Sequence, residues 1–264
     1  MKKTGKRLLA AMLLFCTILI GAAGYEVMAA DEAQSTESTS GTVNSADDLP
    51  GKRIGVQLGT TGDIYVSDYE SDGSGTVVER YNKGADAIQA LKQGKIDCVV
   101  IDEQPAIKFV EQNTGIRILD EEFTLEEYAF VIAKDNTELL DKVNSVLEKL
   151  EADGTIANIQ KNYIGTADEI GKFPYESKDV SHENGTLTVG TNAEFPPYES
   201  YEDGQIVGID MDIMRAVSDE LGMELKIEDM AFDSIIPAIS TGKVDIGAAG
   251  FTVTEERKKN VNFT

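Results

Sequence analysis

Histidine, cysteine and basic side chains are all scarce in this chain. Its 264 residues include one His, two Cys and no Trp, and 24 Lys and Arg face 47 Asp and Glu, which gives a formal net charge of −23. The one histidine, His182, lies in a polar stretch, which excludes a Ser-His-Asp or Cys-His arrangement and a His-based zinc site within the folded segments. The negative charge argues against nucleic acid or an anionic membrane as a partner.

The N-terminus carries the features of an export signal. Residues 1–30 join a basic stretch, MKKTGKR, to the apolar run LLAAMLLFCTILIGAAG and to small residues before Ala30. Because Cys16 lies inside that run, Cys98 would be the only cysteine of the mature protein, and no intrachain disulfide is expected. We therefore expect an exported protein, at the cell surface, in the periplasm or outside the cell. The alternative is that the apolar run remains as a membrane anchor.

The rest of the chain divides into blocks of different composition. Residues 31–48 contain almost no apolar side chain, which predicts a flexible acidic linker. Strand and helix patterns alternate over 49–135, and helical patterns follow over 136–165. Residues 166–185 lose this periodicity and predict a second polar linker, and alternation resumes over 186–264. Such alternation predicts an α/β fold in which helices cover mostly parallel sheets.

The hydrophobic patterns predict individual elements. The expected strands are 52–58, 76–81, 96–102, 127–134, 186–191, 224–230, 244–250 and 261–263. The expected helices are 63–69, 84–95, 208–222 and 234–243, with a helical region over 137–165. A short helix capped by Thr254 is expected before the last strand.

Two segments of the chain repeat each other. ALKQGKIDCVV at 90–100 aligns with AISTGKVDIGA at 238–248, so that Ala, Gly, Lys and Asp agree in register. This agreement indicates two related lobes. The simpler explanation is that any strand-helix-strand unit can look alike, because Gly is a favoured helix stop.

Two loops at the ends of predicted strands could bind a small molecule. Asn192 ends one strand, and Phe195 and Tyr198 flank the two prolines that follow; the aromatic rings could wall a ligand or simply anchor the loop in the core. Thr60 and Thr61 lie in QLGTTGD, where hydroxyls and free N–H groups at a helix start suit a carboxylate. That loop lacks the Gly-Lys-Ser/Thr ending of a phosphate loop, and an ordinary strand-to-helix turn would explain it equally well.

Three further polar residues follow predicted strands. Arg257, a few residues beyond Thr252, offers a planar fork that can hold a carboxylate through two hydrogen bonds. Asp102 ends the strand 96–102 and could pair with an ammonium group. The competing interpretations are a solvated ion pair for Arg257 and a helix N-cap for Asp102.

Together these stretches resemble the extracellular solute-binding proteins of polar amino-acid ABC transporters, family 3, which have the two-lobed type II periplasmic-binding-protein fold. The family's first lobe resembles LTVGTNAEFPPYE, GIDMDIMRAVSDELG, MAFDSIIPAISTGKVDIGAAG and TVTEERKKNVNF. Its second lobe and C-terminal helices resemble DLPGKRIGVQLGTTGD, ALKQGKIDCVVIDEQPA and LEADGTIANIQKNYIG. The resemblance covers most of 48–165 and 186–264.

The resemblance implies a role for each matching residue. Arg257, helped by Thr252, Thr60 and Thr61, would hold an amino acid's α-carboxylate, while Asp102 and the Gly250 backbone would hold its α-ammonium. Phe195 and Phe232 would wall the side chain, and Asn192, where the family often has Asp, would help to select it. The implied protein is a non-enzymatic receptor that delivers a polar amino acid to a membrane ABC permease, without a metal or cofactor. The alternatives are a cyclohexadienyl-dehydratase-like catalyst and a sensor domain.

The order of the lobes departs from the family pattern. Here the family's second lobe comes first, which implies a circular permutation with its break in the hinge. We expect 49–135 and 186–264 to face each other across a cleft, with the helices of 136–165 packed on the latter lobe. A missing crossover strand would leave an unpaired sheet edge in 49–135, open to self-association or to a partner's strand. A truncated or rearranged, non-binding product is the alternative.

Overall fold

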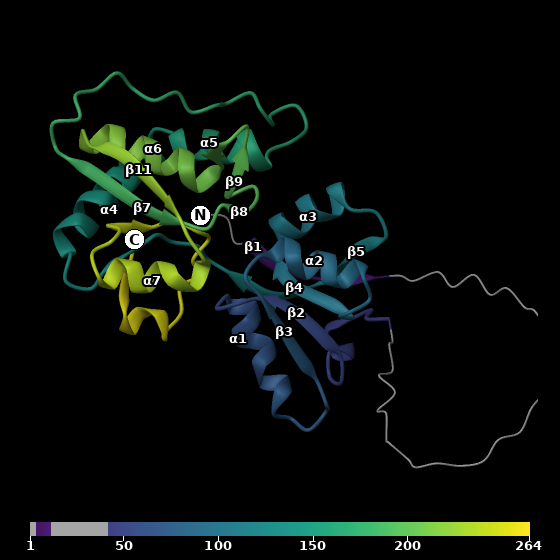
Figure 1. Cartoon of the computed structure of the whole chain (residues 1–264). Helices are drawn as coiled ribbons and strands as arrows, with labels where there is room; N and C mark the ends of the chain where they lie inside the picture. The colour runs from purple at the N-terminus through teal and green to yellow at the C-terminus, as the bar shows by residue number, and fades with distance from the viewer. Residues whose placement is uncertain (1–3, 12–41) are drawn as a thin grey trace, which may run out of the picture.

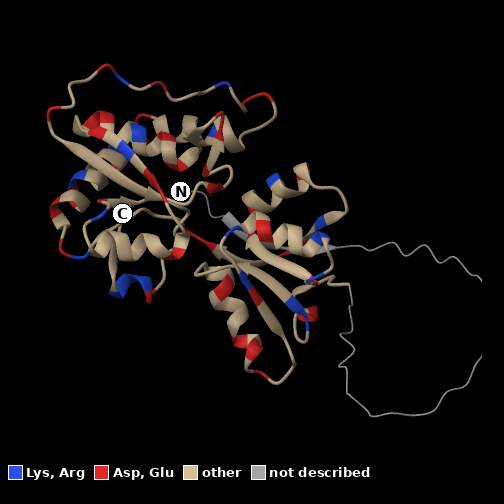
Figure 2. Ribbon diagram, in the orientation of Figure 1, with Lys and Arg blue, Asp and Glu red and all other residues tan. Residues whose placement is uncertain are grey.

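The computed structural model describes residues 4–11 and 42–264, and these form two α/β lobes (Figure 1). We call β1 with residues 42–126 the N-terminal lobe and residues 131–264 the C-terminal lobe. The expected α/β class is confirmed. Within the described ranges, none of the helices has the length and apolar content needed to span a membrane. Figure 2 shows acidic residues on both lobes, with basic residues among them.

The N-terminal lobe contains one five-stranded sheet with the order β3-β2-β4-β1-β5. Its strands are β1 (Thr4–Ala11), β2 (Arg53–Gln57), β3 (Val77–Tyr81), β4 (Cys98–Asp102) and β5 (Ile116–Glu126). Strands β2, β3 and β4 are parallel, and β1 runs antiparallel to both β4 and β5. The helices are α1 (Thr61–Ser67), α2 (Gly84–Lys92) and α3 (Glu103–Gln112). Figure 1 shows α1 and α2 on opposite faces of this sheet.

Strand β1 occupies the position where an unpaired edge was expected. Lys6 lies opposite Asp102 of β4, and Thr4 lies opposite Glu126 of β5. The expectation of an unpaired edge is therefore wrong at this position, because β1 pairs with β4 on one side and with β5 on the other. The remainder of the expected export signal, residues 1–3 and 12–30, lies outside the described residues.

The expected acidic linker ends earlier than its composition indicates. Residues 31–41 lie outside the described residues, but Val43 is fully buried in a cluster with Leu49 and Ile54. A 3₁₀ helix, η1 (Ala46–Asp48), follows, and Arg117 donates a hydrogen bond to Asn44 over 3.0 Å. The folded part therefore includes 43–48, because one buried valine ties this polar segment to the lobe.

The C-terminal lobe has a mixed sheet and a small meander. The sheet order β11-β7-β12-β6-β13 is formed by β6 (Val131–Ala133), β7 (Thr186–Thr191), β11 (Glu224–Asp229), β12 (Ile246–Gly247) and β13 (Val261–Phe263). The meander comprises β8 (Glu194–Phe195), β9 (Glu199–Glu202) and β10 (Gln205–Val207). The helices are α4 (Thr137–Ala152), α5 (Thr155–Ile164), α6 (Ile209–Leu221), α7 (Phe232–Ser240) and the 3₁₀ helix η3 (Arg257–Lys259).

Helices α4 and α5 pack on α6, and the segment 166–185 follows them. Lys149 of α4 pairs with Glu220, and the Tyr163 hydroxyl donates to Asp212 over 2.8 Å. Asp219 of α6 is buried and accepts hydrogen bonds from the Tyr175 hydroxyl and the Lys178 N–H, both over 2.8 Å. Residues 166–185 form no helix or strand, and these bonds tie them to α6.

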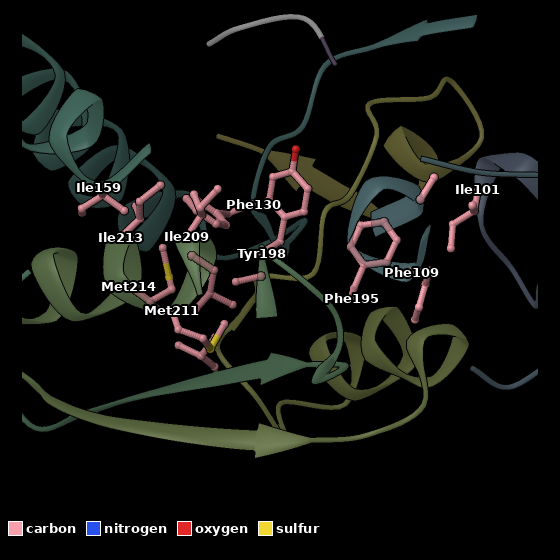
Figure 3. Packing of buried hydrophobic residues seen from close by; sticks show 14 of the residues in the cluster. Ile101, Phe109, Phe130, Ile159, Phe195, Tyr198, Ile209, Met211, Ile213 and Met214 are labelled. Carbon is pink, nitrogen blue, oxygen red and sulfur yellow. The ribbon is translucent and has the colours of Figure 1, made fainter. Parts of the chain in front are cut away.

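The lobes meet through residues 127–130 and through buried side chains. Ala129 N–H donates to Phe251 O over 2.9 Å, and Tyr128 forms an isolated bridge with Thr252, so regular strand in the expected 127–134 segment is confined to β6. Figure 3 shows Phe195 between residues of the N-terminal lobe, Ile101 and Phe109, and residues of the C-terminal lobe such as Tyr198. The largest hydrophobic cluster therefore continues from one lobe into the other.

Candidate functional site

A small cavity lies where the carboxyl ends of β2, β4 and β7 approach η3 and α7. Its volume is about 10 Å³, room for about one water molecule, so a larger ligand could enter only if the lobes part. The lining comes from both lobes and consists of Gln57, Thr60, Thr61, Asp102, Asn192, Phe195, Glu199, Phe232, Ala249, Gly250, Thr252 and Arg257. The structure thus brings together the nine residues to which the resemblance assigns a role, and it adds Gln57, Glu199 and Ala249. Tyr198, the other aromatic residue of the loop, is buried but does not line the cavity.

Arg257 joins the lobes at one end of the cavity. Its Nη1 donates to Thr252 O over 2.9 Å, and its Nη2 donates to Gly59 O of the other lobe over 3.0 Å. The guanidinium lies 5.4 Å from the ring centre of Phe232 and 5.3 Å from that of Phe251, and the two rings stack 4.7 Å apart. Burial lowers the pKa of Arg257 from its ordinary value, whereas Glu126 and Asp102 act to raise it. The side chain is 7% exposed and therefore does not form the solvated surface pair considered above.

Glu126, at the end of β5, is a site residue that the sequence analysis did not identify. Its Oε2 accepts hydrogen bonds from Thr61 Oγ1 over 3.0 Å and from Thr252 Oγ1 over 2.5 Å, and the side chain is buried. Two of the three threonines that the resemblance assigns to a ligand carboxylate thus already donate hydrogen bonds to a carboxylate of the protein. Glu126 is one of two adjacent glutamates, and no motif distinguishes the buried one from its exposed neighbour Glu127.

Asp102 occupies the N-cap position of α3 but does not act as a cap. Its backbone is extended, with φ −64° and ψ 151°, and its side chain makes no capping hydrogen bond to the helix. The side chain is 8% exposed and lines the cavity. Tyr128 lies beside it: burial first, and then the charge of Asp102, raise the pKa of the Tyr128 hydroxyl well above its usual range.

Asn192 and Gln57 form a second bridge between the lobes. Gln57 Nε2 donates to Asn192 Oδ1 over 2.9 Å, and Asn192 Nδ2 donates to Met230 O over 2.9 Å. Because the amide of Asn192 is satisfied on both sides, its orientation is fixed. An aspartate at this position would repel the Met230 carbonyl, which explains why an amide suits this contact.

The aromatic residues and Gly250 pack closely around residues 127–130, the connection between the lobes. The rings of Phe195 and Tyr198 stack 5.8 Å apart, and Tyr198 meets Tyr128 edge to face at 5.1 Å. Gly250 has a φ of 59°, and a Cβ there would lie 3.0 Å from the Phe195 ring. Both the backbone conformation and the space therefore favour glycine.

Two buried carboxyl groups, those of Glu199 and Asp210, lie next to the loop that carries these rings. Glu199 is fully buried, and Asp210 accepts the Gly250 N–H over 3.1 Å. Burial raises the pKa of Asp210 to about 7, while burial and then the charge of Asp210 raise that of Glu199 well above its ordinary range.

Metal binding and thiol reactivity both depend on how the described His, Cys, Asp and Glu side chains are placed. Over 4–11 and 42–264, no three His, Cys, Asp or Glu side chains group closely enough to hold a metal ion. Cys98 is fully buried in β4, and burial raises the pKa of its thiol to about 12, so the thiolate that metal binding or nucleophilic attack requires is suppressed.

Comparison with known proteins identifies the family. Residues 74–166 and 187–264 match the profile of the bacterial extracellular solute-binding proteins, family 3. The arginine-binding protein ArgT of Corynebacterium glutamicum is 44% identical over 82 residues, which are 31% of this chain and 27% of that one. The L-cystine-binding protein TcyJ of Escherichia coli K12 is 30% identical over 135 residues, 51% of this chain and 50% of that one. The chain thus spans between about a quarter and a half of the length of these relatives.

Solved structures show similar partial matches. An ancestral arginine-binding protein bound to glutamine is 29% identical, with a TM-score of 0.46 over 62% of this chain and 61% of that one. Holo ArgBP from T. maritima is 30% identical, with a TM-score of 0.42 over 57% of this chain and 54% of that one. Because the family profile covers more than half of the residues, the chain belongs to the bacterial extracellular solute-binding proteins of family 3.

Proposed function

We propose that this protein is an exported receptor that captures a polar amino acid between its lobes and delivers it to a membrane ABC permease. The observation that carries the proposal is the convergence of Arg257 and Asp102, opposite charges from different lobes, on one cavity. An amino acid carries the complementary pair of charges on one carbon atom. Relatives named as arginine-, histidine- and cystine-binding proteins support the same class of ligand.

Binding would exchange contacts within the protein for contacts with the ligand. The α-carboxylate would replace Gly59 O as an acceptor for Arg257 and would take hydroxyl or N–H donors from Thr252, Thr60 and Thr61. Asp102 and the carbonyl of Gly250 would accept from the α-ammonium. Phe195 and Phe232 would wall the side chain, with Asn192 at its polar end. The lobes would part and close about residues 127–130, a hinge motion common in binding proteins.

Titration calorimetry against the twenty amino acids tests this proposal. Arg257→Ala and Asp102→Ala should each reduce the affinity for the best ligand by about 2–5 kcal/mol, because each leaves a buried charge of the ligand without its partner. Lys258→Ala is the matched control, since Lys258 is exposed and pairs with Glu255 on the same turn. Turnover of prephenate-like acids, or no amino-acid binding at millimolar concentration, would contradict the receptor function.

The permuted order of the lobes belongs to this proposal as well. In a circular permutant, 166–185 would join the family's two ordinary termini, and the bonds from this segment to Asp219 support such a covalent strap. Cutting the chain within 166–185 and joining its present ends should then preserve folding and binding. A rearranged, non-binding product would gain no activity from this operation. Self-association remains part of the proposal for chains that lack β1, which include the form that would be left if residues 1–30 were removed on export.

A further inference from the structure

Glu126 occupies two hydroxyl groups that the proposed receptor needs for its ligand. Its Oε2 accepts hydrogen bonds from Thr61 Oγ1 of the N-terminal lobe over 3.0 Å and from Thr252 Oγ1 of the C-terminal lobe over 2.5 Å. All three residues are buried, so these contacts lie away from bulk solvent. A threonine hydroxyl carries one proton and donates one hydrogen bond, so neither hydroxyl can serve Glu126 and a ligand carboxylate together.

The charge of Glu126 also acts on the cation of the site. Burial lowers the pKa of Arg257, and the charge of Glu126 opposes this effect more than that of any other group, with Asp102 next. The Glu126 carboxylate is therefore close enough to offset the charge of Arg257, the residue proposed to hold the α-carboxylate. A second carboxylate that approaches Arg257 meets the charge of the first, and like charges brought together in a buried site oppose binding.

Glu126 has a further partner on its other side, towards the surface. It ends β5, directly before the connection between the lobes, and Tyr65 of α1 lies beside it. Burial and then the charge of Glu126 raise the pKa of the Tyr65 hydroxyl, which is also hydrogen-bonded to Glu126. Tyr65 is 37% exposed. A carboxylate displaced from the two threonines would thus keep a hydroxyl partner, which avoids a buried, unpaired charge.

We infer that Glu126 is an internal competitor of the ligand's α-carboxylate: it holds the hydroxyls of Thr61 and Thr252 in the closed lobes and yields them when an amino acid binds. This inference rests on the proposed amino-acid receptor. The exchange replaces one carboxylate by another at the same two donors, so these hydroxyls add little net affinity. Glu126 therefore lowers the affinity for the amino acid and speeds its release, which suits a receptor that passes its ligand to a permease.

Glu126→Gln tests the competition, because glutamine keeps the size of the side chain and removes its charge. In calorimetric titrations of the full chain, the best-binding amino acid should bind about tenfold more tightly to this variant than to the parent. The amine that remains when the α-carboxyl group of that amino acid is removed should gain nothing, since it brings no carboxylate to displace Glu126. Glu127→Gln, at the exposed neighbouring position, is the matched control and should behave as the parent.

Two results with the variant would overturn the inference: an unchanged or weaker affinity for the amino acid, or an equal gain for the amine. A crystal structure of the parent with its ligand is a second test, which requires no variant to fold. In that structure Glu126 Oε2 should have left Thr252 Oγ1, and a Glu126 that still accepts from both hydroxyls would also overturn the inference. Failure of every amino acid to bind both parent and variant would instead overturn the receptor function.

Discussion

Arg257 illustrates how one residue can close a cleft. Its two hydrogen bonds run to Thr252 O of its own lobe and Gly59 O of the other, and its charge is buried beside two stacked phenylalanine rings. Hydrogen bonds from a charged donor are among the stronger ones in proteins, and this side chain therefore favours the closed arrangement. A ligand carboxylate with the same geometry would strengthen that preference.

Burial of Glu199 and Asp210 should make stability depend on pH. Their pKa values are raised in the folded state, that of Asp210 to about 7 from an ordinary 3.8, so the folded protein binds more protons than the unfolded chain above pH 4. Stability should therefore fall as pH rises from about 4 to 7. Glu199→Gln should raise the free energy of unfolding at pH 8 by about 1–4 kcal/mol, because its amide can donate to Asp210 without a buried second charge. Urea unfolding at pH 4 and 8 measures this. A variant that is less stable than the parent at pH 8 would contradict it.

Any side chain at Gly250 should lower the stability of the fold. Gly250→Ala should destabilise the fold by about 1–2 kcal/mol from its left-handed backbone, with a further loss from contact with the Phe195 ring. Gly242→Ala is the matched control, because Gly242 has a φ of 70° and open space around its Cα. Thermal unfolding of both variants separates backbone strain from crowding. Equal losses at the two positions would show that the close approach to Phe195 is unimportant.

Individual site residues differ in how well sequence can predict them. Some site residues follow directly after predicted strands, where a polar side chain in a loop indicates the sheet edge at which a ligand binds. Thr60, Asn192 and Arg257 are of this kind, and the family resemblance assigns each of them a role. Glu126 and Glu199 are ordinary acidic residues in a strand-like context. Only tertiary packing buries them, and a chain with 47 acidic residues offers no local signal to select these two.

Among the elements, β1 has the largest effect on the N-terminal lobe. It supplies the backbone partners of both β4 and β5, so removing it would expose two strand edges at once. A chain that begins at residue 42 should therefore unfold at a lower temperature than the full chain and should associate at high concentration. A synthetic peptide of residues 4–11 should restore stability, whereas a scrambled peptide should not.

Thermal unfolding and sedimentation velocity measure these two effects. Equal stability and an unchanged sedimentation coefficient for the two chains would show that the sheet does not depend on β1.

Strong hydrophobic patterns predicted most helices and strands, whereas elements with weak hydrophobic patterns were missed for physical reasons. The helices α2, α4, α5 and α6 follow clear apolar stripes, whereas β5 reads as IRILDEEFTLE, with a run of charges that hides its alternation. The meander β8–β10 consists of strands of two to four residues, too short for a periodic signal. The segment 4–11, which we expect to belong to an export signal, forms β1 in the structure, and its short mixture of basic and apolar residues gives no strand pattern.

At the scale of the whole molecule, the described lobes share one covalent connection, residues 127–130, and several polar bridges across the cleft. These bridges include Arg257 to Gly59, Gln57 to Asn192, Thr252 to Glu126 and Lys83 to Glu194. The first three surround the cavity, so opening of the lobes and entry of a ligand are coupled. The affinity measured in solution will therefore include the free energy needed to break these contacts.

The central claim is that an amino acid binds through both of its backbone charges, one to each lobe. The most direct measurement is a pair of calorimetric titrations of the full chain, with the best-binding amino acid and with the amine that remains when its α-carboxyl group is removed. The account predicts stoichiometric binding of the amino acid and at least about a 30-fold weaker affinity for the amine, because Arg257 loses its partner. Equal affinity for the two molecules would contradict it.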